Sequence, residues 1–166
     1  MTEITKLSWE DIENCCIKLY EQILSINIKI DTIVSIQRGG CIPGVILSHM
    51  LHVDECYTIG IRTTCSDNVR SRRLDDPKIQ IPETLRSISG KNVLIVDDVT
   101  NTGNTLVYAK EEVLKFNPCN CFTSVLIWDG DNSFECKADL FARHTPGWVV
   151  FPWEVVSGSE AKRNRL

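Results

Sequence analysis

Two adjacent carboxylates stand between an apolar run and a polar loop in the stretch VLIVDDVTNTGNTL, residues 93–106. At the end of a buried strand, Asp97 and Asp98 can reach a cleft, where they would accept hydrogen bonds from a diol or bind Mg²⁺. The loop that follows offers hydroxyls, a glycine and the N–H groups of a helix start, which favour an anion. A diol or metal site beside an anion site is typical of proteins that bind a phosphorylated sugar. Each half alone also fits a strand end and an ordinary helix cap.

A second cluster, QRGG at residues 37–40, follows the short apolar strand expected over residues 31–36. Arg38 is a permanent cation, and Gly39 and Gly40 let the backbone approach an oxyanion closely. Taken alone, these residues fit an ordinary turn. Because the carboxyl ends of parallel strands meet at one edge of a sheet, this loop and residues 97–105 are predicted to share a site.

The surrounding pattern alternates strands and helices, which predicts an α/β fold with a mainly parallel sheet. Residues 8–11 resemble a capping box before a helix. Further strands are expected over residues 56–61, 93–96, 122–128 and 138–142, and helices after Pro43 and from Leu106. Residues 63–82 are polar and highly charged, which predicts either a long exposed loop or a mobile hairpin.

Composition limits the function classes. The chain has 166 residues, which fits one domain, and a net charge of −4, which argues against a general nucleic-acid binder. We see no apolar run long enough for a membrane span and no signal-peptide pattern, so we expect a cytoplasmic protein. The eight cysteines lack zinc-finger spacing and are expected to be reduced core residues.

The stretch VLIVDDVTNTGNT resembles the phosphoribosyl-pyrophosphate (PRPP) binding signature of the type I phosphoribosyltransferases. The resemblance extends over residues 5–154, since LSWEDIENCCIKL, SIQRGGCIPGVIL, SDNVRS and GWVVFPWE resemble segments of bacterial xanthine-guanine phosphoribosyltransferases in order and spacing. It implies a single-domain fold over residues 1–156, in which helices flank a mainly parallel sheet. A flexible loop and a small hood of terminal segments complete the implied fold, and residues 157–166 are expected to form a flexible tail.

For the sugar-phosphate half of the site, the resemblance implies that Asp97 and Asp98 hold the ribose hydroxyls and contact Mg²⁺, with Asp98 nearer the metal. The pyrophosphate loop corresponds to Arg38, Gly39 and Gly40. The cup for the 5′-phosphate corresponds to Thr100, Asn101, Thr102, Gly103, Asn104 and Thr105. Arg70 matches an arginine that reaches PRPP from the flexible loop, and it fits a solvated charge run equally well.

For the nucleobase half, the resemblance implies that Trp148 stacks on the purine and that the backbone of Val149 contacts its edge. A structural core role is the alternative for Trp148. Two positions depart from the family pattern. Asn101 replaces an aspartate that serves the purine N7, and Trp128 or Asp129 replaces a lysine that reads the purine O6. Asn cannot act as a general base, and Asp129 is better suited to accept a hydrogen bond.

The leading hypothesis is an enzyme that transfers the 5-phosphoribosyl group of PRPP to a purine-like base with Mg²⁺ and releases pyrophosphate. Guanine, xanthine or hypoxanthine is the favoured acceptor, and Asp97, Asp98, Asn101 and Arg38 are the candidate catalytic residues. One alternative is a transferase for another heterocycle, and another is a non-catalytic PRPP or nucleotide sensor. By analogy we expect a homodimer or homotetramer.

Overall fold

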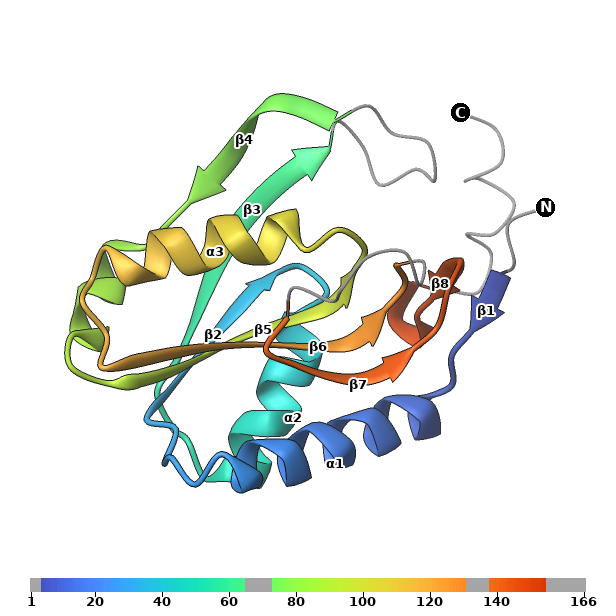
Figure 1. Cartoon of the computed structure of the whole chain (residues 1–166), viewed down its shortest axis with the longest axis horizontal. Coiled ribbons are helices and arrows are strands. Elements are labelled where there is room, and N and C mark those ends of the chain that lie inside the picture. The colour runs from blue at the N-terminus through green and yellow to red at the C-terminus, as the bar shows by residue number, and fades with distance from the viewer. Residues whose placement is uncertain (1–3, 65–72, 131–137, 155–166) are drawn as a thin grey trace.

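The fold is α/β, as predicted. The computed structural model describes residues 4–64, 73–130 and 138–154, and its centre is a six-stranded sheet of order β4-β3-β2-β5-β6-β7 (Figure 1). All neighbouring strands are parallel except the pair β3 and β4. The strands are β2 (Thr32–Gln37), β3 (Cys56–Thr64), β4 (Arg73–Gln80), β5 (Asn92–Thr100), β6 (Asn120–Trp128) and β7 (Leu140–His144).

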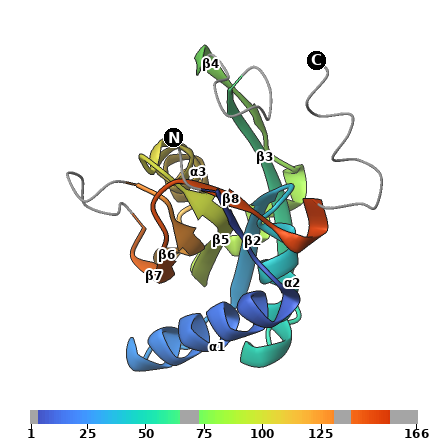
Figure 2. The same cartoon turned by 90° about the vertical axis from the view of Figure 1, so that its right-hand side faces the viewer.

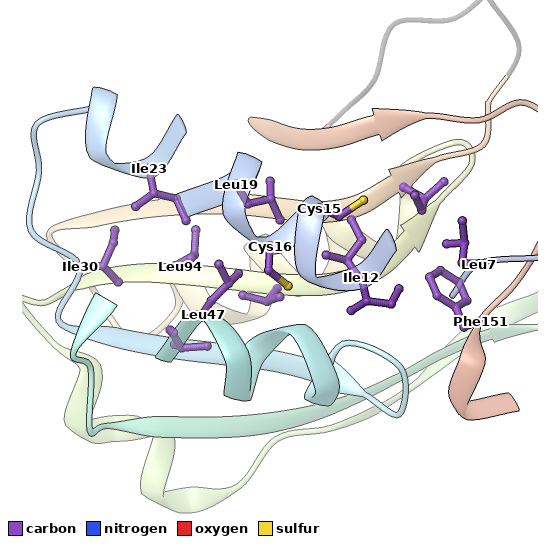
Figure 3. Packing of buried hydrophobic residues seen from close by; sticks show 14 of the residues in the cluster. Leu7, Ile12, Cys15, Cys16, Leu19, Ile23, Ile30, Leu47, Leu94 and Phe151 are labelled. Carbon is purple, nitrogen blue, oxygen red and sulfur yellow. The ribbon is translucent and has the colours of Figure 1, made fainter. Parts of the chain in front are cut away.

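Helices cover both faces of this sheet. Helices α1 (Trp9–Ser25) and α2 (Cys41–Leu51) pack on one face, and α3 (Asn104–Leu114) packs on the other. Strand β5 serves both cores by alternation, since Leu94 and Val96 face the first and Val93 and Ile95 face the second. Figure 3 shows side chains of α1, α2 and β5 meeting in the first core. The sheet is therefore buried on both faces, so a ligand site can form only at the ends of its strands.

The start of α1 confirms the predicted capping box. The Asp11 backbone N–H donates to Ser8 Oγ at 3.1 Å, and the Ser8 backbone N–H donates to Asp11 Oδ2 at 2.8 Å. Two backbone donors at the helix start are thereby satisfied by side chains.

The prediction of a long exposed loop over residues 63–82 is wrong for residues 73–80. They form the edge strand β4 rather than a loop, and β4 pairs antiparallel with β3 through matches such as Ile61 with Ile79. A short 3₁₀ helix, η1 (Glu83–Ile88), follows and buries Leu85 and Ile88. The sequence predicted β5 only to residue 96, but the strand continues through both carboxylates to Thr100 because β6 pairs with it along this whole length.

A two-stranded sheet lies on the side toward which β6 and β7 point (Figure 1 and Figure 2). It pairs β1 (Ile4–Lys6) with β8 (Trp148–Val150) in parallel and precedes η2 (Pro152–Glu154). This is the predicted hood of terminal segments. Arg70, within the predicted flexible loop, and the predicted tail at residues 157–166 lie outside the described residues. In the described part of the chain, no helix combines the length and apolar character of a membrane span.

Candidate active site

Of the two carboxylates of the opening motif, Asp97 is buried and Asp98 is half-buried. Asp97 is 7% exposed and accepts a hydrogen bond from the Asp98 backbone N–H at 3.0 Å. Asp98 in turn accepts from the Val99 backbone N–H at 2.9 Å. Burial and the neighbouring Asp98 charge raise the pKa of Asp97 well above its ordinary value, and burial raises the pKa of Asp98 to about 6. The pair is an electrostatically unfavourable arrangement that a cation or hydrogen-bond donors would relieve.

The glycine loop between β2 and α2 packs directly against this pair. A β-carbon on Gly39 would lie 1.6 Å from Asp98 Oδ2, and one on Gly40 would lie 2.5 Å from the Val96 carbonyl oxygen. The peptide bond between Gln37 and Arg38 is cis. The structure thus brings together the two loops that the sequence assigned to one edge of the sheet, with Arg38 exposed beside them.

The polar loop after β5 leads into α3. Gly103 caps this helix with φ of 75°, a left-handed conformation that favours glycine, and it has no side chain to accept from the first N–H groups of the helix. Thr102, Asn104 and Thr105 are half-buried around this cap. The helix start therefore has the geometry of an anion site next to the two carboxylates.

The two positions that depart from the expected pattern contact each other. Asn101 Nδ2 donates a hydrogen bond to Asp129 Oδ1 at 3.1 Å. Their strands are neighbours, and the Asp129 backbone N–H donates to the Thr100 carbonyl oxygen at 3.0 Å. Burial raises the pKa of Asp129, and the hydrogen bond from Asn101 opposes this rise. A polar pair therefore lies at the ends of β5 and β6.

Comparison with known proteins identifies the family. Residues 5–156 match the phosphoribosyl transferase domain. The chain belongs to the phosphoribosyltransferase family. It is an enzyme of the type I group, a transferase, and its α/β sheet is the fold of that group.

Named relatives cover most of this phosphoribosyltransferase chain. It is 30% identical to hypoxanthine-guanine phosphoribosyltransferase of Schizosaccharomyces pombe, over 89% of this chain and 87% of the relative. It is 24% identical to xanthine-guanine phosphoribosyltransferase of Idiomarina loihiensis, over 90% and 86%. The crystal structure of a purine phosphoribosyltransferase from Pyrococcus horikoshii superposes with a TM-score of 0.73 at 29% identity, over 92% of this chain and 95% of that one.

The residues at the site fit a magnesium ion. Mg²⁺ takes oxygen ligands, keeps several waters and is usually held by one or two carboxylates together with substrate phosphates. Asp97 and Asp98 supply two adjacent carboxylates, and burial, together with nearby negative charge, raises the pKa of each. A cation bound beside Asp97 and Asp98 would stabilise their charged forms.

The candidate base-stacking residues lie in the hood. Trp148 is half-buried in β8, and Val149 is buried there, opposite Thr5 of β1. Trp128, the other aromatic candidate, stacks on His144 at 4.1 Å between ring centroids and meets Phe141 edge-on at 5.7 Å. These contacts occupy Trp128 within the sheet, so Asp129 is the better placed of the two to meet a polar group of a base.

Sequence reasoning missed Glu154. It ends η2, its Oε2 accepts from the Phe151 backbone N–H at 3.0 Å, and its charge contributes to the raised pKa of Asp98. A residue of the hood therefore interacts electrostatically with the carboxylate of Asp98. The segment GWVVFPWE contains this residue and contributes to the family resemblance, but only Trp148 and Val149 of it are predicted site residues.

Proposed function

We propose that this transferase moves the 5-phosphoribosyl group of PRPP to a ring nitrogen of a purine-like base, in the presence of Mg²⁺. The bond from C1 of the ribose to the pyrophosphate oxygen breaks, pyrophosphate leaves with the electron pair, and the base nitrogen bonds to C1. The observation that carries the proposal is the contact of the glycine loop with Asp98 beside the start of α3. This contact supports a single site in which the ribose, the 5′-phosphate and the pyrophosphate of PRPP each meet a different group of residues.

Each residue then has a defined role. Asp97 and Asp98 accept hydrogen bonds from the ribose hydroxyls, and they would hold the metal. Residues 100–105 bind the 5′-phosphate through N–H groups and hydroxyls at the start of α3. The pyrophosphate binds at Arg38, Gly39 and Gly40, where the cation and the close backbone stabilise the negative charge that develops. Mg²⁺ held at this site would neutralise charge on the pyrophosphate.

The base half of the site is assigned to Asn101, Asp129, Trp148 and Val149, with Trp128 as a packing neighbour. The names of the relatives favour guanine, xanthine or hypoxanthine as the acceptor and a role in purine salvage. In this proposal the enzyme works in the cytoplasm as a homodimer or homotetramer. Arg70 would close over PRPP from the loop.

The test is an assay of pyrophosphate release from PRPP and MgCl₂ with a panel of purine and other heterocyclic bases. We expect release with at least one base, abolished by EDTA and by Asp98→Ala. The matched control is Asp54→Asn, because Asp54 is an exposed carboxylate before β3, and this variant should leave pyrophosphate release unchanged. Absence of release with every base would contradict the proposal, and PRPP binding without turnover would favour a sensor of the same fold.

A further inference from the structure

The hydrogen bond between Asn101 and Asp129 fixes the orientation of the Asn101 amide. A carboxylate accepts and cannot donate, so the amide must direct its NH₂ group toward Asp129. The distances agree, since Asn101 Nδ2 lies 3.1 Å from Asp129 Oδ1 and 3.5 Å from the Asp129 backbone oxygen. The other end of the amide, Oδ1, is therefore a hydrogen-bond acceptor directed away from Asp129.

Asp129 is itself held in place from both sides. Its backbone N–H donates to Thr100, and the next residue, Gly130, is bonded through its carbonyl oxygen to His144 Nε2 at 2.7 Å. The turn is tight, because a β-carbon on Gly130 would lie 2.2 Å from Trp128 Nε1 and 3.0 Å from the Asn101 carbonyl oxygen. Two acceptors, Asn101 Oδ1 and the Asp129 carboxylate, are thus preorganised side by side.

The names of the relatives favour 6-oxopurines. We infer that in this chain the pair of Asn101 and Asp129 instead selects a purine with donors at both N7 and position 6, namely a 6-aminopurine such as adenine or 2,6-diaminopurine. The inference rests on the proposed transfer to a purine. Asn101 Oδ1 accepts from N7–H, and Asp129 accepts from the 6-amino group. Holding the proton on N7 leaves the N9 lone pair free to bond to C1 of the ribose. The N7 proton then leaves to water, so no general base is required at position 101.

A 6-oxopurine meets this pair less well. Its O6 is an acceptor and would face the Asp129 carboxylate, so both groups would lose hydrogen bonds to water without gaining one. A site whose polar groups are positioned to hydrogen-bond one substrate strongly rejects an analogue that leaves those groups unpaired. We expect kcat/KM to favour 6-aminopurines over the matching 6-oxopurines by on the order of 10²-fold.

The experiment compares kcat/KM for adenine and 2,6-diaminopurine with that for hypoxanthine, guanine and xanthine, at saturating PRPP and Mg²⁺. Assays are run at pH 8 and repeated at a higher pH, because burial raises the pKa of Asp129 and a neutral acid there would donate to O6. The key variant is Asp129→Asn, which has nearly the same shape and can donate to O6, so the preference should move toward 6-oxopurines by at least tenfold. Asp54→Asn makes the same chemical change at an exposed position and should leave the preference unchanged.

The outcomes are separable. A preference of the unmodified enzyme for hypoxanthine, guanine or xanthine would overturn the inference and leave the proposed function standing. An Asp129→Asn variant that folds, turns over and keeps the original preference would also overturn it. Absence of pyrophosphate release with any base would overturn the proposed function, and the inference with it.

Discussion

The α-carbon of Gly39 lies against the Asp98 carboxylate, so that a β-carbon at position 39 would stand 1.6 Å from Asp98 Oδ2 and 2.2 Å from Cγ. Two loops separated by nearly sixty residues in the sequence are therefore in direct contact. Only hydrogen fits between them, so the identity of residue 39 and the position of the carboxylate depend on each other.

Gly39→Ala is predicted to disable the enzyme by displacing Asp98. The added methyl group cannot fit, and either the carboxylate or the loop must move. We expect kcat/KM for PRPP to fall by at least about 10²-fold, since misplacing a catalytic group by 1 Å has an effect of this size. Steady-state kinetics with PRPP as the varied substrate give the measurement.

The matched control for this variant is Gly90→Ala. A β-carbon there meets nothing within 4 Å, although φ of 73° makes alanine strained. The control should lower the free energy of unfolding by about 1 kcal/mol and leave kcat/KM unchanged. Equal kinetic losses in both variants would show that close contact with Asp98 is not the cause.

That residues 37–40 and 97–105 lie together was predictable, because the proposed sugar-phosphate residues form two short runs in the sequence. Residues 97–105 supply two carboxylates, a polar loop and a helix start in order, and the rule that strand ends of a parallel sheet meet at one edge predicted residues 37–40 beside them. The bond between Asn101 and Asp129 was not predictable. It depends on the register that sets Thr100 opposite Trp128 and on the orientation of two side chains.

Three strands of the fold, β4, β1 and β8, could not be predicted from local sequence patterns. The edge strand β4 contains Asp75, Asp76 and Pro77, a composition typical of loops, yet an edge strand tolerates charge and proline because one side of its backbone needs no partner. Strands β1 and β8 have three residues each, too few to show a period of two. The hood was therefore expected only from the family resemblance.

Asp11→Asn is predicted to weaken the start of α1 without affecting catalysis. Hydrogen bonds from the Ser8 side chain and backbone lower the pKa of Asp11, with a smaller contribution from Arg143. Loss of the charged cap should lower the free energy of unfolding by about 0.5–1 kcal/mol at pH 7. Urea titration of both proteins measures the difference.

The pH dependence of this difference follows from the sign of the shift. Because the folded-state pKa of Asp11 lies below its ordinary value of 3.8, the stabilisation is complete well above pH 3.8 and is lost as pH falls through the folded-state value. The gap between the two proteins should therefore shrink on acidification. A gap that widens at low pH would contradict this assignment.

Trp148→Leu is predicted to weaken binding of the base and to leave PRPP binding intact. Stacking of a base on an aromatic ring contributes about 1–3 kcal/mol, so KM for the base should rise at least fivefold. The dissociation constant for PRPP, measured by calorimetry without a base, should stay within twofold. Trp9→Leu is the control, because Trp9 is exposed and contacts Trp153 rather than the predicted base site. An equal rise in KM in both variants would assign Trp148 to packing of the hood.

Asp97→Asn is predicted to separate stability from function. Asp97 is buried, and both burial and the adjacent Asp98 disfavour its charged form, whereas asparagine keeps the shape and can still accept from the Asp98 backbone N–H. Without ligands, the variant should unfold at the same or a higher temperature at pH 8, with a gain of up to about 1 kcal/mol. Mg²⁺ with PRPP should raise the Tm of the unmodified enzyme, because a ligand of the folded state stabilises it, and should not raise that of the variant.

The control for this trade-off is Asp139→Asn. Asp139 accepts hydrogen bonds from Thr123 and pairs with Lys110 at 3.0 Å, so its loss should lower Tm while the ligand-induced rise persists. Opposite signs for two Asp→Asn changes in one protein would separate a carboxylate that ligands need from one that the fold needs. A lowered Tm in Asp97→Asn, or a retained rise with Mg²⁺ and PRPP, would remove Asp97 from the proposed ligand set.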